Sequence, residues 1–128
     1  MDALPPQSVL IVDDALLYRR LLAGLLRQWG YQVFEAENGE QALALLAQET
    51  VSLVISDWEM PVMDGLTLCR EIRQQLQDRY IYIIVLTARD SVEDLRVGFA
   101  AGADDFLRKP VNQVELQARL HACLLYTS

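Results

Sequence analysis

Short apolar segments alternate with segments of helical periodicity along the chain, and this alternation constrains the fold more than any other feature. The clearest unit begins with the apolar residues 51–56, which lead directly into Asp57. Pro61 and the Asp-Gly pair ending at Gly65 then favour a loop, and an apolar stripe at helical spacing follows over residues 66–76. By the same patterns we predict strands at residues 8–12, 31–35, 52–56, 80–86 and 104–108, and helices at residues 15–29, 40–48, 66–76 and 112–125. Asn38 is a candidate N-cap for the second helix, and a further helix begins after a cap at Asp90 or Ser91 and ends near Gly102.

Strands that alternate with helices of this length predict a parallel sheet with helices on both faces. The first, third and fourth strands are almost wholly apolar, which indicates burial on both sides, whereas residues 31–35 alternate and suit an edge. We therefore predict an α/β fold of (βα)5 type: a doubly wound, parallel five-stranded sheet in the flavodoxin-like order 2-1-3-4-5, with three α/β/α layers. We expect one domain at residues 8–125, a disordered leader at 1–7 and a tail at 126–128.

Polar side chains stand directly after four of the predicted strands. Asp13 and Asp14 follow the first strand, Asp57 the third, Thr87 the fourth and Lys109 the fifth. Taken singly, each is most often a turn residue, a helix cap or a solvated charge, and one of the two adjacent aspartates can cap the first helix. The carboxyl ends of parallel strands lie at one edge of the sheet, so the shared position of these residues predicts one site.

The charges of this predicted site indicate its chemistry. Close carboxylates repel one another, and a bound cation relieves that repulsion. Hard oxygen ligands suit Mg²⁺ better than zinc or copper. Asp57 is placed to attack phosphorus and form an acyl phosphate. Lys109 would bring positive charge to the phosphoryl oxygens, and the Thr87 hydroxyl would donate to one of them.

The overall composition argues against several other classes of protein. The net charge of −7 disfavours nucleic acid or an anionic membrane as the direct partner. The apolar runs are too short to cross a bilayer, and residues 1–7 lack the basic and apolar parts of a secretory signal. Cys69 and Cys123 lack metal-ligand spacing, and we expect both to lie in or near the core of a reduced, cytoplasmic protein.

Four stretches of the chain form a recognisable set: Asp13-Asp14, residues 57–65 (Asp-Trp-Glu-Met-Pro-Val-Met-Asp-Gly), Thr87-Ala88, and residues 101–110 (Ala-Gly-Ala-Asp-Asp-Phe-Leu-Arg-Lys-Pro). With this set the chain, over residues 8–125, resembles the CheY-like receiver domains of bacterial two-component response regulators. The resemblance implies a phosphorelay switch, with only self-directed phosphoryl transfer and autodephosphorylation instead of enzymatic turnover. The phosphoryl donor would be a phosphohistidine on a sensor histidine kinase or a histidine phosphotransfer protein.

The resemblance also implies roles for individual residues. Asp57 would be the phosphoacceptor. Asp14 would ligate Mg²⁺ directly, with Asp13 assisting, often through water, and the backbone carbonyl of Glu59 completing the protein ligands. The Lys109–Pro110 peptide bond is often cis in this family.

A switch pair of Thr87 and Phe106 is implied as well. Phosphorylation would draw Thr87 and Lys109 toward the phosphoryl group and repack the face formed by the fourth helix, fifth strand and fifth helix. That face would bind an output domain, a partner protein or a second copy of the chain. Phe106 stands where many members have tyrosine and has no hydroxyl, so its alternative role is half-buried packing.

Glu59 and Arg89 lie two residues after Asp57 and Thr87, at positions that in the resembled family tune the lifetime of the phosphoryl group. An ion pair between them across the path of attacking water would be exposed and contribute little free energy. We expect Trp58 to be partly exposed beside the site and to report metal or phosphate by fluorescence. His121 stands alone on the last helix, and we expect it at the surface.

Three other functions compete with the switch. A phosphohydrolase with an aspartyl nucleophile usually places it on the first strand in an Asp-x-Asp arrangement and adds a cap domain, whereas Asp13 and Asp14 are adjacent. A flavin-binding module needs a Ser/Thr/Gly-rich phosphate loop after the first strand, and Asp-Asp-Ala-Leu cannot hold an anion. The third competitor is a receiver-like scaffold that is never phosphorylated.

Overall fold

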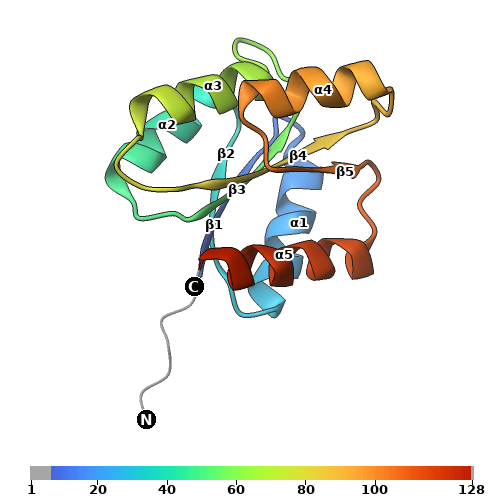
Figure 1. Ribbon diagram of the computed structural model, residues 1–128. Helices are drawn as coiled ribbons and strands as arrows, with labels where there is room; N and C mark the ends of the chain where they lie inside the picture. Colours follow the sequence, from blue (N-terminus) through green and yellow to red (C-terminus); the bar gives the residue numbers. More distant parts are fainter. Residues whose placement is uncertain (1–6, 128) are drawn as a thin grey trace.

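The computed structural model describes residues 7–127, the last four of them by their backbone alone. Within these residues, strands and helices alternate as the sequence predicts (Figure 1). The elements are β1 (Ser8–Val12), α1 (Leu16–Gln28), β2 (Gln32–Ala36), α2 (Gly39–Gln48), β3 (Leu53–Asp57), α3 (Gly65–Gln75), β4 (Tyr82–Thr87), α4 (Val92–Ala101), β5 (Asp105–Arg108) and α5 (Gln113–Thr127).

The strands form one parallel sheet in the order β2-β1-β3-β4-β5, which confirms the predicted fold class. Figure 1 shows α2, α3 and α4 on one face of the sheet and α1 and α5 on the other. The more polar β2 lies at an edge, as expected. The order reverses between β1 and β3, and that reversal opens the carboxyl edge of the sheet to ligands.

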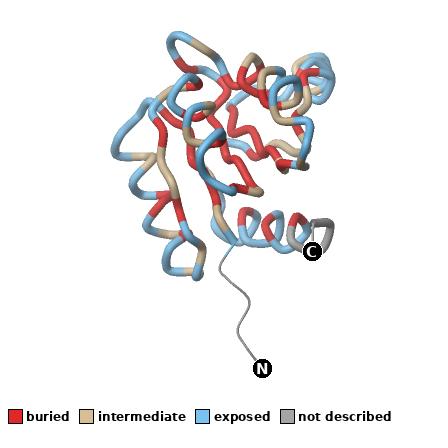
Figure 2. The backbone as a smooth tube through the Cα atoms, turned by 90° about the vertical axis from the view of Figure 1, so that its left-hand side faces the viewer, coloured by how far each residue is buried: buried red, intermediate tan, exposed pale blue. Residues whose placement is uncertain are grey.

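Two hydrophobic clusters hold the layers together, one on each face of the sheet. Successive residues of β1 alternate between them, because side chains of a strand point to opposite faces. Leu10 and Val12 contact the α2–α4 side, and Val9 and Ile11 contact the α1–α5 side, all of them fully buried. Burial of each such side chain contributes about 1.5–3 kcal/mol. Figure 2 shows the same pattern, with buried strands inside and exposed outer helix turns.

Side-chain caps explain where four of the helices begin. Asn38 accepts a hydrogen bond from the backbone N–H of Gln41, as the sequence predicts. Equivalent caps are made by Asp64, Ser91 and Asn112. Ser91 therefore caps α4, which decides between the two candidates at residues 90 and 91. Each such cap stabilises its helix by about 1 kcal/mol.

The two ends of the predicted domain need correction. Gln7 is not part of a disordered leader, because its carbonyl accepts from Gln32 N–H at 2.9 Å and its side chain accepts from Ser52 at 3.0 Å. The rest of that leader lies outside the described residues. Helix α5 continues through Thr127, so the tail expected from residue 126 is wrong there, and Ser128 is also outside the described residues. Among the described residues, no helix is both long and apolar enough to span a membrane.

Candidate functional site

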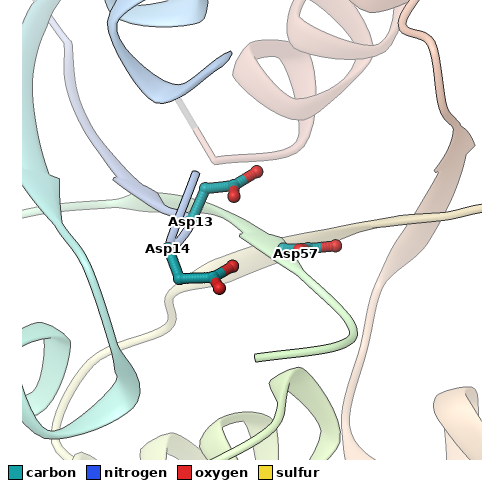
Figure 3. A group of neighbouring side chains, drawn as sticks. All are labelled: Asp13, Asp14 and Asp57. Carbon is teal, nitrogen blue, oxygen red and sulfur yellow. The ribbon is translucent and has the colours of Figure 1, made fainter. Parts of the chain in front are cut away.

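Three carboxylates meet at the carboxyl edge of the sheet, where β1 and β3 end side by side. Asp13 and Asp14 follow β1, and Asp57 is the last residue of β3. One oxygen atom from each of the three lies within 4.8 Å of the others. In Figure 3 the three side chains extend in the same direction from the two strand ends. Asp13 and Asp57 are buried and Asp14 is exposed, so the cluster has a closed floor and an open side.

The loop after β1 is held by hydrogen bonds on every side of Asp13. Its backbone N–H donates to the Ala36 carbonyl of β2 at 3.1 Å. Its carboxylate accepts from Ala15 N–H at 2.9 Å, and its carbonyl accepts from the Arg19 guanidinium at 2.8 Å. Arg19 in turn pairs with Glu35 at 3.1 Å. Neither aspartate is the N-cap of α1, which is Ala15 without a side-chain bond, so the capping alternative for this pair is wrong.

The position of Asp57 depends on a glycine. A Cβ atom on Gly65 would lie 2.4 Å from the Asp57 carbonyl oxygen, a distance at which the backbone has to move. The Gly65 N–H donates to the Trp58 carbonyl at 2.7 Å, and the Trp58 N–H donates to Leu86 of β4 at 3.0 Å. The Asp-Gly pair therefore starts α3 directly against the strand end that carries Asp57, which is closer than any other residue allows.

Lys109 reaches two of the three carboxylates. Its Nζ lies 3.0 Å from Asp57 Oδ1 and 3.3 Å from Asp13 Oδ2. Its backbone N–H donates to the Thr87 carbonyl at 3.1 Å, and the following Lys109–Pro110 bond is cis, as the family resemblance implied. Burial alone would lower the pKa of Lys109, but the hydrogen bond to Asp57 and the charges of Asp13 and Asp57 outweigh it and raise that pKa.

The carboxyl group of Asp57 has a raised pKa, although an ion pair by itself lowers the pKa of an acid. Burial is the largest cause, and the charges of Asp13 and Asp14 act in the same direction. The hydrogen bond and charge of Lys109 oppose them and lose. The cluster thus has less positive charge than its carboxylates need. Hard oxygen donors short of positive charge fit a divalent cation such as Mg²⁺.

Thr87 is buried at the end of β4, one residue beyond the register partner of Asp57. Its hydroxyl oxygen accepts a hydrogen bond from the backbone N–H of Arg89 at 2.9 Å. Because a hydroxyl can accept and donate at once, its proton stays available to a further acceptor.

The ion pair expected between Glu59 and Arg89 is present, with Arg89 Nη2 at 2.9 Å from Glu59 Oε1. Arg89 also reaches Asp94 on α4 at 3.4 Å, and its guanidinium lies over the Trp58 ring at 4.9 Å from the centroid. Trp58 is only 6% exposed, so the expectation of partial exposure is wrong. The Arg89 guanidinium and the Phe106 ring both lie beside the Trp58 indole, and the Trp58 and Phe106 ring centroids are 6.0 Å apart.

Phe106 is half-buried and contacts α4. Its ring fits against Gly98, where an added Cβ atom would come within 2.2 Å of the Phe106 ring. The Phe99 ring meets it edge-on, with centroids 4.8 Å apart. The packing role considered for Phe106 is therefore real. The same contacts connect Trp58, next to Asp57, with the helix that follows Thr87.

Several contacts of the site do not follow from motif reading. Tyr18 on α1 places its ring 4.9 Å from Lys109 Nζ, and Asp94 and Gly98 contact Arg89 and Phe106 from α4. For Tyr18 a weak signal exists, since it lies in the first turn of α1, close in the chain to Asp13 and Asp14 at this edge of the sheet. His121 is exposed and both cysteines are buried, as expected from the sequence.

A sequence model of the response regulator receiver domain matches residues 9–121. The response regulator MprA of Mycolicibacterium vanbaalenii is 43% identical over 123 residues, which are 96% of this chain and 52% of that protein. This chain thus spans about half the length of the curated relatives it matches.

Solved structures give the same picture. The chemotaxis response regulator CheY4 of Vibrio cholerae is 35% identical with a TM-score of 0.86, covering 92% of this chain and 98% of that one. A chain is also similar in the co-crystal structure of the Saccharomyces cerevisiae histidine phosphotransfer signalling protein Ypd1 with the receiver domain of its downstream response regulator Ssk1. That chain is 29% identical with a TM-score of 0.82, covering 92% of this chain and 88% of its own length.

Proposed function

Because this chain belongs to the family of response regulator receiver domains, we propose that it is a switch in which Asp57 accepts a phosphoryl group from a phosphohistidine. One observation carries the proposal: the Asp57 carboxylate stands at a strand end with two further carboxylates beside it and the Lys109 ammonium 3.0 Å away. Such a site attracts a divalent cation and offers a nucleophile, and these are the two requirements of aspartyl phosphate formation.

The transfer needs little covalent machinery. A carboxylate oxygen of Asp57 attacks phosphorus, the P–N bond to the donor imidazole breaks, and the departing ring takes up a proton. Asp13, Asp14, Asp57 and the backbone carbonyl of Glu59 would hold Mg²⁺, which when bound supplies positive charge to the phosphoryl oxygens. Lys109 stabilises the same oxygens with its positive charge, and the Thr87 hydroxyl donates a hydrogen bond to one of them.

Phosphorylation would then act on the α4–β5–α5 face. Thr87 and Lys109 shift toward the phosphoryl group, and Phe106 repacks against its seat at Gly98 on α4. Arg89 and Glu59 cover the path of attacking water and set the lifetime of the phosphoryl group. A modest bias between two existing packings suffices, since about 1.4 kcal/mol changes a population ratio tenfold.

The partners follow from this chemistry. The donor is a sensor histidine kinase or a histidine phosphotransfer protein, in the reduced cytoplasm of a bacterium. The α4–β5–α5 face receives an output domain, a partner protein or a second copy of the chain. Loss of the phosphoryl group is autodephosphorylation, a self-directed reaction without turnover of an external substrate.

The direct test is incubation with acetyl phosphate or beryllofluoride in the presence and absence of Mg²⁺, followed by intact mass and Trp58 fluorescence. We expect one Mg²⁺-dependent adduct per chain, lost in Asp57→Asn and retained in Glu93→Gln, which removes an exposed carboxylate of α4. An adduct that survives Asp57→Asn, or none in the wild type, would refute the proposal. Repeated turnover of a phosphomonoester would favour the hydrolase instead.

A further inference from the structure

The Lys109 ammonium is enclosed on three sides. Asp57 and Asp13 accept from it at 3.0 Å and 3.3 Å, and the third side is the face of the Tyr18 ring, 4.9 Å from Nζ to the centroid. Lysine has a long, flexible side chain, so its ammonium reaches one place reproducibly only where the surroundings exclude the others. Two of the three walls belong to the acidic cluster, and Tyr18 supplies the remaining one.

Tyr18 also contacts the segment that carries Lys109. Its hydroxyl oxygen accepts a hydrogen bond from the backbone N–H of Val111 at 3.3 Å. Its side chain packs on the α1–α5 cluster beneath the sheet. One residue of α1 therefore restrains both the side-chain end of Lys109 and the backbone two residues further along.

An aromatic ring suits this position chemically. A carboxylate in place of the ring would accept hydrogen bonds from Lys109 and so compete with the oxygens of Asp57 and of the phosphoryl group. A ring face attracts the cation through its quadrupole and leaves the three N–H groups pointing elsewhere. The attraction has little directional preference, so the ammonium can follow a phosphoryl oxygen without breaking a hydrogen bond to the ring.

We propose that Tyr18 is a positioning residue for phosphoryl transfer, with its ring holding the Lys109 ammonium at Asp57. The inference rests on the proposed function, because it concerns the rate of the same transfer. The ring and the hydroxyl make separate contacts, so they can be separated by substitution.

Three variants separate the contributions. Tyr18→Phe keeps the ring and removes the hydroxyl, and Tyr18→Leu removes both. Tyr18 borders an open hollow of about 490 Å³ between α1 and the segment after β5, which gives the smaller side chain room to adjust. Tyr82→Leu is the matched control, because Tyr82 packs on the same cluster but starts β4, at the opposite edge of the sheet.

The sequence provides a direct probe of position. Lys109 is the single lysine of the chain, all other basic side chains apart from His121 being arginines. Protein labelled with ¹³C-lysine therefore gives one ε-methylene signal, and no assignment is needed. A ring face beside that group shifts its proton resonance upfield. We expect the upfield shift in the wild type, Tyr18→Phe and Tyr82→Leu, and its loss in Tyr18→Leu.

The second readout is the rate of Mg²⁺-dependent phosphorylation by acetyl phosphate, followed by intact mass. We expect Tyr18→Leu to be slower by roughly three- to tenfold, the range for loss of a partly desolvated cation–π contact. Tyr18→Phe and Tyr82→Leu should stay within about twofold of wild type, since they keep the ring beside Lys109.

The inference would be overturned if Tyr18→Leu were phosphorylated at the wild-type rate and kept its ε-methylene signal at the upfield position of the wild type. Equal slowing in Tyr18→Phe and Tyr18→Leu would overturn the role of the ring, and slowing in Tyr82→Leu would reduce the effect to general stability. If the wild type takes up no phosphoryl group, the proposed function and the role in transfer fail together. The ε-methylene shift then still decides whether the ring holds the ammonium.

Discussion

Two ion pairs at the site have nearly the same nitrogen–oxygen distance, but they differ in how far water reaches them and in what surrounds each cation. Lys109 and Asp57 are 3.0 Å apart with side chains 27% and 11% exposed. Arg89 and Glu59 are 2.9 Å apart but 41% and 69% exposed. Water competes with the second pair more than with the first, so nearly equal distances correspond to unequal free energies.

The surroundings of the two cations differ in the same sense. Lys109 faces two carboxylates and an aromatic ring. The carboxylates raise the pKa of Lys109 against the effect of burial, and burial is the largest cause of the raised pKa of Asp57. Arg89 divides its guanidinium between Glu59 and Asp94 and rests on the indole of Trp58. The Lys109 side is therefore built to stabilise charge. The Arg89 side has a loose polar cover above tight aromatic packing.

The largest effect is expected from Lys109→Met, which keeps the length of the side chain and removes its charge. The remaining carboxylates would then repel one another without compensation. We expect phosphorylation by acetyl phosphate to slow by about 100-fold. In metal-free buffer the free energy of unfolding should fall by about 2 kcal/mol, a loss typical of a partly buried pair, and Mg²⁺ should restore part of it.

Chemical denaturation and intact mass measure these two effects, and Arg89→Met is the matched control on the other side. If Lys109→Met and Arg89→Met lowered the free energy of unfolding equally, the greater burial of the Lys109–Asp57 pair would not increase its contribution to stability.

A smaller effect is expected from Gly98→Ala, which tests the packing below Arg89. The new methyl group would collide with the Phe106 ring, and such overpacking costs about 1–3 kcal/mol. The higher helix propensity of alanine offsets up to about 1 kcal/mol of that loss. Thermal unfolding should therefore show a net loss. Phe106→Ala should cancel the collision, so the double-mutant cycle should give a favourable coupling energy.

Gly24→Ala is the control for helix propensity, because nothing lies within 4 Å of a Cβ atom at Gly24 in α1. It should gain stability by up to about 1 kcal/mol. If Gly98→Ala and Gly24→Ala raised the stability equally, the Phe106 ring would not pack against Gly98 of α4.

The raised pKa of Asp57 predicts a pH-dependent effect of Asp57→Asn in metal-free buffer. A carboxyl group whose pKa is higher folded than unfolded favours the folded state when protonated, and that contribution disappears as the pH rises through the folded pKa. Above this pKa, the amide should therefore be more stable than wild type. The difference should shrink as the pH falls toward 3.8, the ordinary value. Urea titrations of both proteins across that range measure it, and a gain that grows toward low pH would contradict it.

The smallest effect on stability is expected from Arg89→Met. An exposed pair contributes less than about 0.5 kcal/mol, so the free energy of unfolding should hardly move. The lifetime of the aspartyl phosphate should shorten by roughly two- to fivefold, because the cover over the path of water is lost. Decay of the adduct by intact mass measures this lifetime, and Arg96→Met, which removes an exposed arginine of α4, should leave it unchanged. An unchanged lifetime would remove Arg89 from the function of the site.

The sheet and the carboxylate cluster could be predicted from the sequence because both depend on local patterns. Apolar runs of strand length ended in Asp13-Asp14, Asp57 and Thr87, and parallel strands bring such ends to one edge. The loop after β3 also followed from local rules, since Pro61 and the Asp64-Gly65 pair favour a turn there, whereas the Asp64 cap and the close approach of Gly65 came from the structure.

The contacts between elements could not be predicted in this way. The ring of Tyr18 beside Lys109, the seat of Phe106 at Gly98 and the burial of Trp58 each join residues far apart in the sequence. Their side-chain types are compatible with many surroundings, so only the packing of the layers selects one.

The sequence by itself determined the succession of strands and helices along the chain and the polar residues at the strand ends. Hydrophobic periodicity and turn residues act locally, within a few positions along the chain. Only the tertiary structure decided which of the charged groups are buried. Burial is a property of the assembled layers. The sequence predicted that a Glu59–Arg89 pair would be exposed, but only the packing of the layers decided how far Lys109 and Asp57 are shielded from water.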